Sequence, residues 1–200
     1  VIMHFGIDTA IDREKFESTD EKQLAGMLYS EAITHHIARK QQLVAQTMPI
    51  ISNVRKDQGN HIQNVSVPFA DGKRGINVLV KLDRYFETQG MELADALERS
   101  ITLSLIDDAW KEHLRAMDDL RHSVQTAGYE QKDPLVIYKI EAFNAFKMMN
   151  DKVNKEIVSF LSHAAIPVEQ NDARQIKEGS ERKTDMSNMN VNKAQIDAAG

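Results

Sequence analysis

The chain has 200 residues, of which 28% are charged and 6% aromatic, with a net charge of −5 and no cysteine. The lack of cysteine excludes disulfides, thiolate catalysis and cysteine-based metal sites, and the negative balance argues against nucleic-acid binding, which needs a basic surface. Many charged and few aromatic residues favour long amphipathic helices over a β-sandwich.

The first long helix is predicted from about Ser18 to Met48. Ser18 and Glu21 have the spacing of a capping box, and an apolar stripe follows that drifts around the helix. Pro49 and Asn53 mark its predicted end, because proline lacks the N–H that a helix interior needs. A drifting stripe is typical of a helix that bends or packs against two partners.

The segment from about 65 to 82 is predicted to form a β-hairpin. Residues 65–69 and 76–82 are β-branched and partly alternating, and residues 70–75 between them are rich in turn formers. Pro68 predicts that the first strand lies at a sheet edge. An isolated hairpin is marginally stable in water, so this one must pack against the neighbouring helices.

Two longer helices are predicted after Gly90. Apolar residues recur at three- and four-residue spacing from about Glu92 to Gln125, and Gly128 suits the end of this helix. Asp133 and Pro134 suit the cap and first position of a second helix, which runs to about Ala165. Two such helices with a short connection predict an antiparallel helical hairpin. Residues 168–200 are polar and predict a flexible tail.

No catalytic or metal site is expected from the polar residues. His35 and His36 are adjacent on a helix and point in different directions, so they do not chelate one ion together. Asp108, Glu112 and Arg115 have the three- and four-residue spacing of a solvated ion-pair face. The G-x-x-x-x-G-K-[ST] pattern of a nucleotide-binding loop is absent from the sequence, and no ATPase activity is expected of this chain. The sequence has no run of about 18 apolar residues, so no membrane-spanning helix is predicted.

Residues 106–114, 117–121 and 128–134, followed by 138–146, resemble in order the two-helix finger of the SecA family of preprotein translocase motors. Several separated matches in the right order are more specific than one short motif. The resemblance is strong over residues 91–165 and weaker before them, where the chain is similar to the helical wing of the family.

The resemblance implies a mainly α fold with three parts. Residues 1–90 are expected to form a helical wing domain that carries the β-hairpin, and residues 91–166 the two-helix finger of the helical scaffold domain. Residues 167–200 are expected to form a disordered C-terminal linker. The chain starts at Val1 in a stretch that reads as the middle of a protein, so a fragment of a longer chain is expected.

The function implied is that of a non-catalytic part of an ATP-driven motor, which moves unfolded preproteins through the SecYEG channel. The expected partners are the unfolded preprotein, the channel, the remaining SecA domains and a second copy of the chain, with no nucleic acid. This part is expected to need no cofactor or metal, because ATP and magnesium belong to the motor domains. The family works in the cytoplasm, as a peripheral protein on the inner face of the cell membrane.

By the same resemblance, Tyr129 at the finger tip is the expected contact to the translocating polypeptide, with Gly128, Glu130 and Gln131 around it. An arginine usual in the family two positions before this tyrosine is Ala127 here, so a positive charge beside the tip is not predicted. The residues expected to pack against the motor or other partners are Trp110, His113, Leu114, Met117 and Phe143.

The residues themselves leave alternatives open. Tyr129 could fold back onto the helix ends, and Trp110 is expected mainly to anchor packing against the partner helix or a neighbouring domain. A stand-alone helical scaffold or chaperone-like module that binds peptides would also explain the nine methionines, whose side chains adapt to varied partners.

Overall fold

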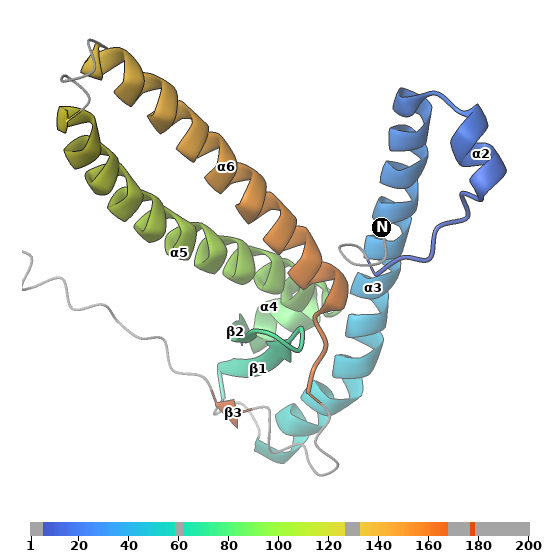
Figure 1. The fold of residues 1–200 in the computed structure, drawn as a ribbon. Helices are drawn as coiled ribbons and strands as arrows, with labels where there is room; N and C mark the ends of the chain where they lie inside the picture. The colour runs from blue at the N-terminus through green and yellow to red at the C-terminus, as the bar shows by residue number, and fades with distance from the viewer. Residues whose placement is uncertain (1–5, 59–61, 127–132, 168–176, 179–200) are drawn as a thin grey trace, which may run out of the picture.

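The computed structural model of the chain describes residues 6–58, 62–126, 133–167 and 177–178. Two long arms diverge from a common root, with a small sheet beside the root (Figure 1). One arm is the long helix α3 with the short helix α2 at its end, and the other is the antiparallel hairpin of α5 and α6. This arrangement confirms the predicted mainly helical fold with a long helical hairpin and a β-hairpin. The elements are α2 (Arg13–Ser18), α3 (Glu21–Gln58), β1 (Asn64–Ala70), β2 (Gly75–Lys81), α4 (Leu82–Glu87), α5 (Met91–Thr126), α6 (Pro134–His163) and β3 (Lys177–Glu178).

The N-terminal helices begin differently from the prediction. Helix α2, which the sequence pattern did not predict, is capped by the side chain of Asp12. Ser18 ends this helix and its hydroxyl bonds back to a carbonyl of the last turn, so it is not available to cap α3. Helix α3 instead begins at Glu21, and the carboxylate of Asp20 accepts a hydrogen bond from the N–H of Lys22 at 3.2 Å. The predicted capping box at Ser18 is therefore wrong.

Helix α3 continues past Pro49 to Gln58, so its predicted end near Pro49 and Asn53 is also wrong. Proline within a helix removes the bond to the carbonyl four residues earlier, here that of Ala45, at a cost of about 3 kcal/mol. Pro49 and Ala45 are exposed, where water can bond the freed carbonyl. Ile51, just beyond, is completely buried, and the burial of apolar side chains around the proline outweighs the lost bond.

Strands β1 and β2 form the predicted antiparallel hairpin, with Val65 opposite Val80 and Phe69 opposite Ile76. Alternate side chains of both strands face the core, as expected for a sheet with one solvated face. The buried members are Val65, Val67, Phe69, Val78 and Val80.

The other side of β1 is partly covered, so β1 is not the edge strand that Pro68 predicted. The short β3 pairs with Val65 and Ser66, and Ala70 exchanges two backbone hydrogen bonds with Ala165. Because successive residues of a strand present their N–H groups to opposite sides, Pro68 faces the same side as Ser66 and Ala70. It lies between their two pairings, and its missing N–H removes no hydrogen bond to β2.

A short helix that the sequence analysis did not predict, α4, links the sheet to the long hairpin. Its Leu82 and Tyr85 are buried, and the chain then turns through Gln89 and Gly90, whose φ angles are 53° and 90°. A Cβ atom on Gly90 would lie 2.8 Å from Cγ1 of Val44 on α3. Glycine at this position therefore allows α5 to begin in direct contact with α3.

The hydrophobic core lies at the root where the two arms meet. The inner face of the sheet packs with Ile51 of α3, Leu97 and Ile101 of α5 and Phe160 of α6. Residues from both predicted parts, 1–90 and 91–166, thus contribute to one core. The root is therefore where most of the buried apolar side chains of the described residues gather.

Helices α5 and α6 agree with their predicted bounds to within a residue or two. Asp133 caps α6 as predicted, since its Oδ1 accepts a hydrogen bond from the N–H of Leu135 at 2.9 Å, and Pro134 is the first helical residue. The predicted helix end at Gly128 lies outside the described residues. So does the predicted tail over 168–200, apart from residues 177–178.

Candidate functional site on the helical hairpin

The predicted substrate-contact residues Tyr129, Gly128, Glu130 and Gln131 lie outside the described residues. The structure does describe the two helix ends that carry them. Helix α5 runs to Thr126 and α6 starts at Pro134, at the end of the hairpin farthest from the core (Figure 1). These two helix ends therefore lie at the far end of a long, double-helical support.

One side of the hairpin exposes a row of apolar side chains. The Trp110 ring lies 5.6 Å from that of His113, which lies 5.9 Å from that of Phe146, so this contact crosses from α5 to α6. Other exposed apolar residues share the side of Trp110 or Phe146, because they lie three or four positions away along each helix. We call this set the apolar face: Leu103, Ile106, Trp110, Leu114, Ile140, Phe143 and Phe146.

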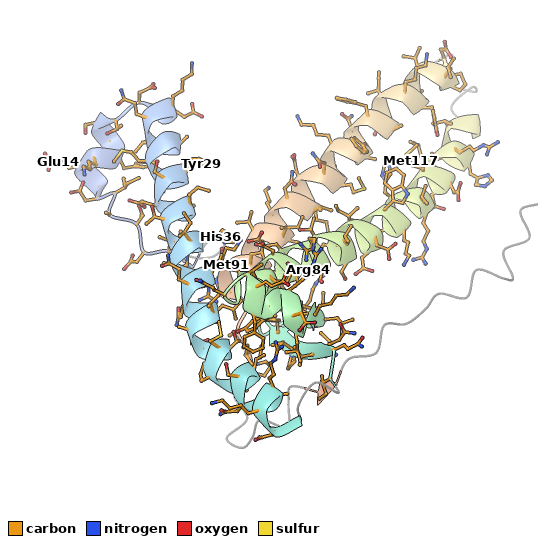
Figure 2. The ribbon with its side chains drawn as sticks, turned by 180° about the vertical axis from the view of Figure 1, so that it is seen from behind. Glu14, Tyr29, His36, Arg84, Met91 and Met117 are labelled. Atoms are coloured by element: carbon orange, nitrogen blue, oxygen red, sulfur yellow. The ribbon has the colours of Figure 1, made fainter. Side chains whose placement is uncertain are left out.

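The residues predicted to pack against partners divide into two groups. Trp110, Leu114 and Phe143 belong to the apolar face and are 45%, 49% and 68% exposed. His113 and Met117 are half-buried (Figure 2 labels Met117 on α5). Exposed apolar surface of this extent on neighbouring helices is typical of a face that another protein surface covers.

The opposite side of the hairpin is charged. Asp108 lies two residues from Trp110, which places it about 200° away around the helix. Arg74, in the β1–β2 turn, reaches Asp108 at 3.9 Å and Glu156 of α6 at 3.1 Å. Glu112 pairs with Lys152 of α6 at 3.0 Å, and this hydrogen bond raises the pKa of Lys152.

Asp108 and Glu112 therefore form ion pairs as predicted, but their partners differ from the predicted ones. The helical spacing suggested pairs within α5, including Arg115, whereas the structure pairs these carboxylates with α6 and the β-turn. These pairs tie the two helices to each other and to the sheet.

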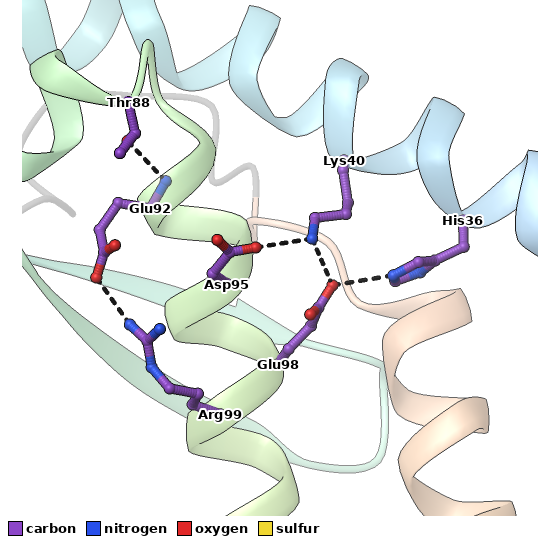
Figure 3. A network of polar contacts seen from close by, with 7 residues as sticks. All are labelled: His36, Lys40, Thr88, Glu92, Asp95, Glu98 and Arg99. Carbon is purple, nitrogen blue, oxygen red and sulfur yellow. Dashed lines mark hydrogen bonds and ion pairs between the residues drawn. The ribbon is translucent and has the colours of Figure 1, made fainter.

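The root holds a second set of charges that the sequence analysis missed. Lys40 of α3 bonds Asp95 at 2.8 Å and Glu98 at 2.9 Å, and Nε2 of His36 lies 2.9 Å from the same Glu98 carboxylate oxygen (Figure 3). On the outer side of α5, Arg99 bonds Glu92 at 2.7 Å. We call the four residues His36, Lys40, Asp95 and Glu98 the clasp. Its members lie 55 and 62 positions apart along the chain, and local spacing carries no signal for such pairs.

Positive groups gather beside the clasp. Burial lowers the pKa of His35, and the nearby Arg39, His36 and His163 lower it further. Arg39 donates a hydrogen bond to the carbonyl of Ala164 at 2.5 Å, just after α6. A neutral His35 avoids adding one more positive charge to this cluster.

Two further points about the described residues concern a metal cluster and a cavity. No group of three or more histidines and carboxylates among them could hold a metal ion. The cavity beside the clasp has a volume of about 110 Å³, and Arg39, Leu43 and Leu97 contribute to its lining. This is room for a few water molecules, and the cations around it already have partners. In the same described ranges, the helices are too short or too polar to cross a membrane.

A family model described as "SecA Wing and Scaffold domain" matches residues 6–165. The chain belongs to this family. The protein translocase subunit SecA of Christiangramia forsetii is 40% identical across the whole chain, and that of Flavobacterium psychrophilum is 39% identical over 88% of it. The SecA of Cytophaga hutchinsonii is 41% identical over 82% of the chain. No solved structure gives a significant match.

The chain spans less than a fifth of the length of these SecA relatives, between 15% and 18%. The match covers both arms of the structure and the root between them. From here on, the finger is our name for α5 and α6, and the wing is our name for the region of α3, α4 and the sheet. The resemblance noted from the finger motifs is confirmed at the level of the family.

Proposed function

We propose that the chain is the wing and finger of an ATP-driven preprotein translocase, and that the finger tip contacts the translocating polypeptide. The observation that carries this proposal is the finger itself, which is anchored in the core at one end and has the helix termini Thr126 and Pro134 at the other. Membership of the SecA family supports the translocation role.

The finger suits the transmission of movement over a distance. Helix α6 has 30 residues and is therefore about 45 Å long, at a rise of 1.5 Å per residue. The ion pairs on the charged side and the Trp110–His113–Phe146 contacts hold α6 against α5. A small rotation at the root becomes a larger displacement at the tip, where Tyr129 would meet the polypeptide. A tyrosine suits this role, since its ring and hydroxyl together contact varied sequences.

The apolar face is where we place the remaining domains of the longer protein, with the tip directed at the SecYEG channel. Burying Trp110 and Phe143 against another domain would gain about 1.5–3 kcal/mol for each side chain. ATP and magnesium would bind in those other domains, and this chain would bind neither. In this proposal the assembly works at the inner face of the cell membrane as a peripheral protein.

Site-specific photocrosslinking in the full-length protein tests the proposed contact. A photoreactive residue replaces Tyr129 while a preprotein is stalled in the channel, and we expect crosslinks to the preprotein. The matched control places the same probe at Ser104, which is exposed on α5 near the root. We expect few crosslinks to the preprotein from that position.

Crosslinks from position 129 only to neighbouring helices of the same protein would overturn the proposed contact and make the tip a structural corner. Equal crosslinking to an unfolded polypeptide without the channel would favour the alternative, a peptide-binding module that acts without a motor. Crosslinks that require both the channel and ATP would support the translocase proposal.

A further inference from the structure

The N-terminal half of α3 stands apart from the core. Thr47 and Ile51 of this helix are completely buried, whereas no described residue of α3 before Thr47 is. Helix α3 and the hairpin of α5 and α6 diverge from the root as the two sides of a V (Figures 1 and 2). Residues 21–44 of α3 together with α2 form one side of this V, and from here on we call only these residues the arm. At the base of the arm, Leu43 packs against the core and Val44 lies against Gly90. Beyond these two residues little apolar burial holds the arm, so polar contacts at its base help to set its position.

Those polar contacts are the clasp and the hydrogen bond from Arg39 to the carbonyl of Ala164. Figure 3 shows Lys40 between the carboxylates of Asp95 and Glu98, which lie on successive turns of α5. His36 contacts the Glu98 carboxylate. The Lys40 side chain is only 20% exposed, so its pairs are less screened by water than ordinary surface pairs. Burial lowers the pKa of Lys40, but the hydrogen bonds to Asp95 and Glu98 outweigh it, and the net pKa is raised. The clasp thus joins the base of the arm to the base of the finger.

The finger side of this joint is fixed by other contacts. Leu97 and Ile101 of α5 are buried in the core, and Arg74 of the β-turn bonds Glu156 of α6. Backbone hydrogen bonds between Ala70 and Ala165 hold the end of the finger to the sheet. If the clasp opens, the arm is therefore the part that moves.

Helix α3 has a weak point beside the clasp. Pro49 removes the helical hydrogen bond to the carbonyl of Ala45, and helices bend at such sites. The interrupted bond lies between Lys40 and the buried Ile51, and so separates the arm from the anchored end of the helix.

We propose that the arm is a salt-sensitive lever, hinged between Ala45 and Pro49 and held at its observed angle by Lys40 and His36 on Asp95 and Glu98. Releasing the clasp changes the angle between the arm and the finger, and with it the width of the V between them. This inference rests on the contacts of the root and does not depend on the proposed role in translocation.

Distance measurements by pulsed electron paramagnetic resonance test the lever in the 200-residue chain. The chain has no cysteine, so Ala25→Cys with Ala116→Cys, both at exposed positions, can be spin-labelled without background. Ala25 lies 24 residues before Pro49, about 36 Å along the helix, so a rotation of about 10° at Pro49 moves it about 6 Å. We expect the label distance to shift by several ångströms and its distribution to broaden between about 0.05 M and about 1 M salt, where the screening length falls to about 3 Å.

Lys40→Met should produce the same shift at low salt, because it removes the charge and keeps a side chain of similar length. Lys40→Arg should keep the distances of the parent chain, since arginine can also bond both carboxylates. The matched control is Lys22→Met, which makes the same charge change at an exposed position of the same helix. We expect this control to leave the distances unchanged.

Restoring the hinge bond separates the two parts of the proposal. Pro49→Ala combined with Lys40→Met should give a smaller shift than Lys40→Met alone, because the helix regains its hydrogen bond to Ala45. Identical distances in the parent and Lys40→Met chains at both salt concentrations would overturn the clasp. An equal shift in Lys22→Met would overturn it as well. The salt series on the parent chain decides the question even if a clasp variant fails to fold.

Discussion

At the scale of single residues, the pair Thr47 and Tyr85 joins α3 to α4 inside the core. Both residues are completely buried, and their hydroxyl oxygens lie 2.8 Å apart. The Thr47 hydroxyl also lies 2.9 Å from the carbonyl of Leu43 and donates to it, so the Tyr85 hydroxyl is the donor to Thr47. A buried polar group that loses its partner costs more than the bond itself contributes.

We expect Thr47→Val to lower the free energy of unfolding by about 1–3 kcal/mol, because the Tyr85 hydroxyl is then buried without an acceptor. Tyr85→Phe should cost less, about 0.5–1.5 kcal/mol, since the Thr47 hydroxyl keeps Leu43. The double variant should lose less than the sum of the two. Urea unfolding of all four chains measures this coupling, and strictly additive losses would show that the two hydroxyls do not interact.

The same pair predicts that the stability of the folded chain decreases at alkaline pH. Burial raises the pKa of Tyr85, and the hydrogen bond with Thr47 lowers it by a smaller amount. A raised pKa in the folded chain gives stability that is complete below the unfolded value of about 10 and is lost as the pH rises through the folded value. Unfolding followed between about pH 8 and 11 should show this loss in the parent chain and a smaller loss in Tyr85→Phe.

At the scale of the elements, the turn from α4 into α5 decides how closely the finger approaches the wing. Gly90 has a positive φ and lies directly against Val44, so both backbone conformation and space require glycine. Gly72, in the β1–β2 turn, has a similar φ of 86° but faces open space. Alanine variants at the two positions therefore separate the cost of backbone strain, which both share, from the cost of crowding, which only Gly90 has.

Gly72→Ala should cost about 1–2 kcal/mol, the price of a left-handed conformation for a residue with a Cβ. Gly90→Ala should cost clearly more, because its methyl group would also displace Val44 and Met48 of α3. Thermal unfolding monitored by circular dichroism compares the two. Equal losses would mean that α3 moves aside freely and that the contact at Gly90 is not tight.

At the scale of the whole molecule, the apolar face is the largest departure from a self-sufficient fold. Two helices can cover only one side of each other, and every residue of the face is at least 45% exposed. The SecA relatives are much longer than this chain. We propose that the corresponding domains of the full-length protein cover the apolar face. In the 200-residue chain the same surface is available to a second copy.

We expect weak self-association through Trp110 and Phe143, measured by sedimentation velocity over a range of concentrations. Phe143→Ser should weaken it about tenfold or more, because burial of a phenylalanine contributes about 1.5–3 kcal/mol. Phe16→Ser is the matched control: Phe16 is 65% exposed, against 68% for Phe143, but lies on α2 away from this face. Trp110 is the only tryptophan, so its emission should shift to shorter wavelength as the chains associate.

A chain that stays monomeric at high concentration, with unchanged tryptophan emission, would contradict this prediction. An equal effect of Phe16→Ser and Phe143→Ser would show that general loss of apolar surface, rather than this face, governs the association.

The sequence by itself determined the elements whose signals are local. The apolar spacing of α5 and α6, the cap formed by Asp133 with Pro134, and the alternation of β1 and β2 depend on neighbouring residues, and the structure confirms them. The ordered motifs of residues 106–146 also indicated the family that the comparisons show.

Tertiary structure decided what depends on distant residues. Pro49 predicted a helix end, but burial of Ile51 in the shared core carried α3 through it. The apolar stripe of α5 reads as continuous in the sequence, yet Ile101 is buried and Trp110 is nearly half exposed, because the core ends where the arms diverge. The clasp joins residues more than fifty positions apart. Local spacing has no information on such pairs, because only the packing of the root brings them together.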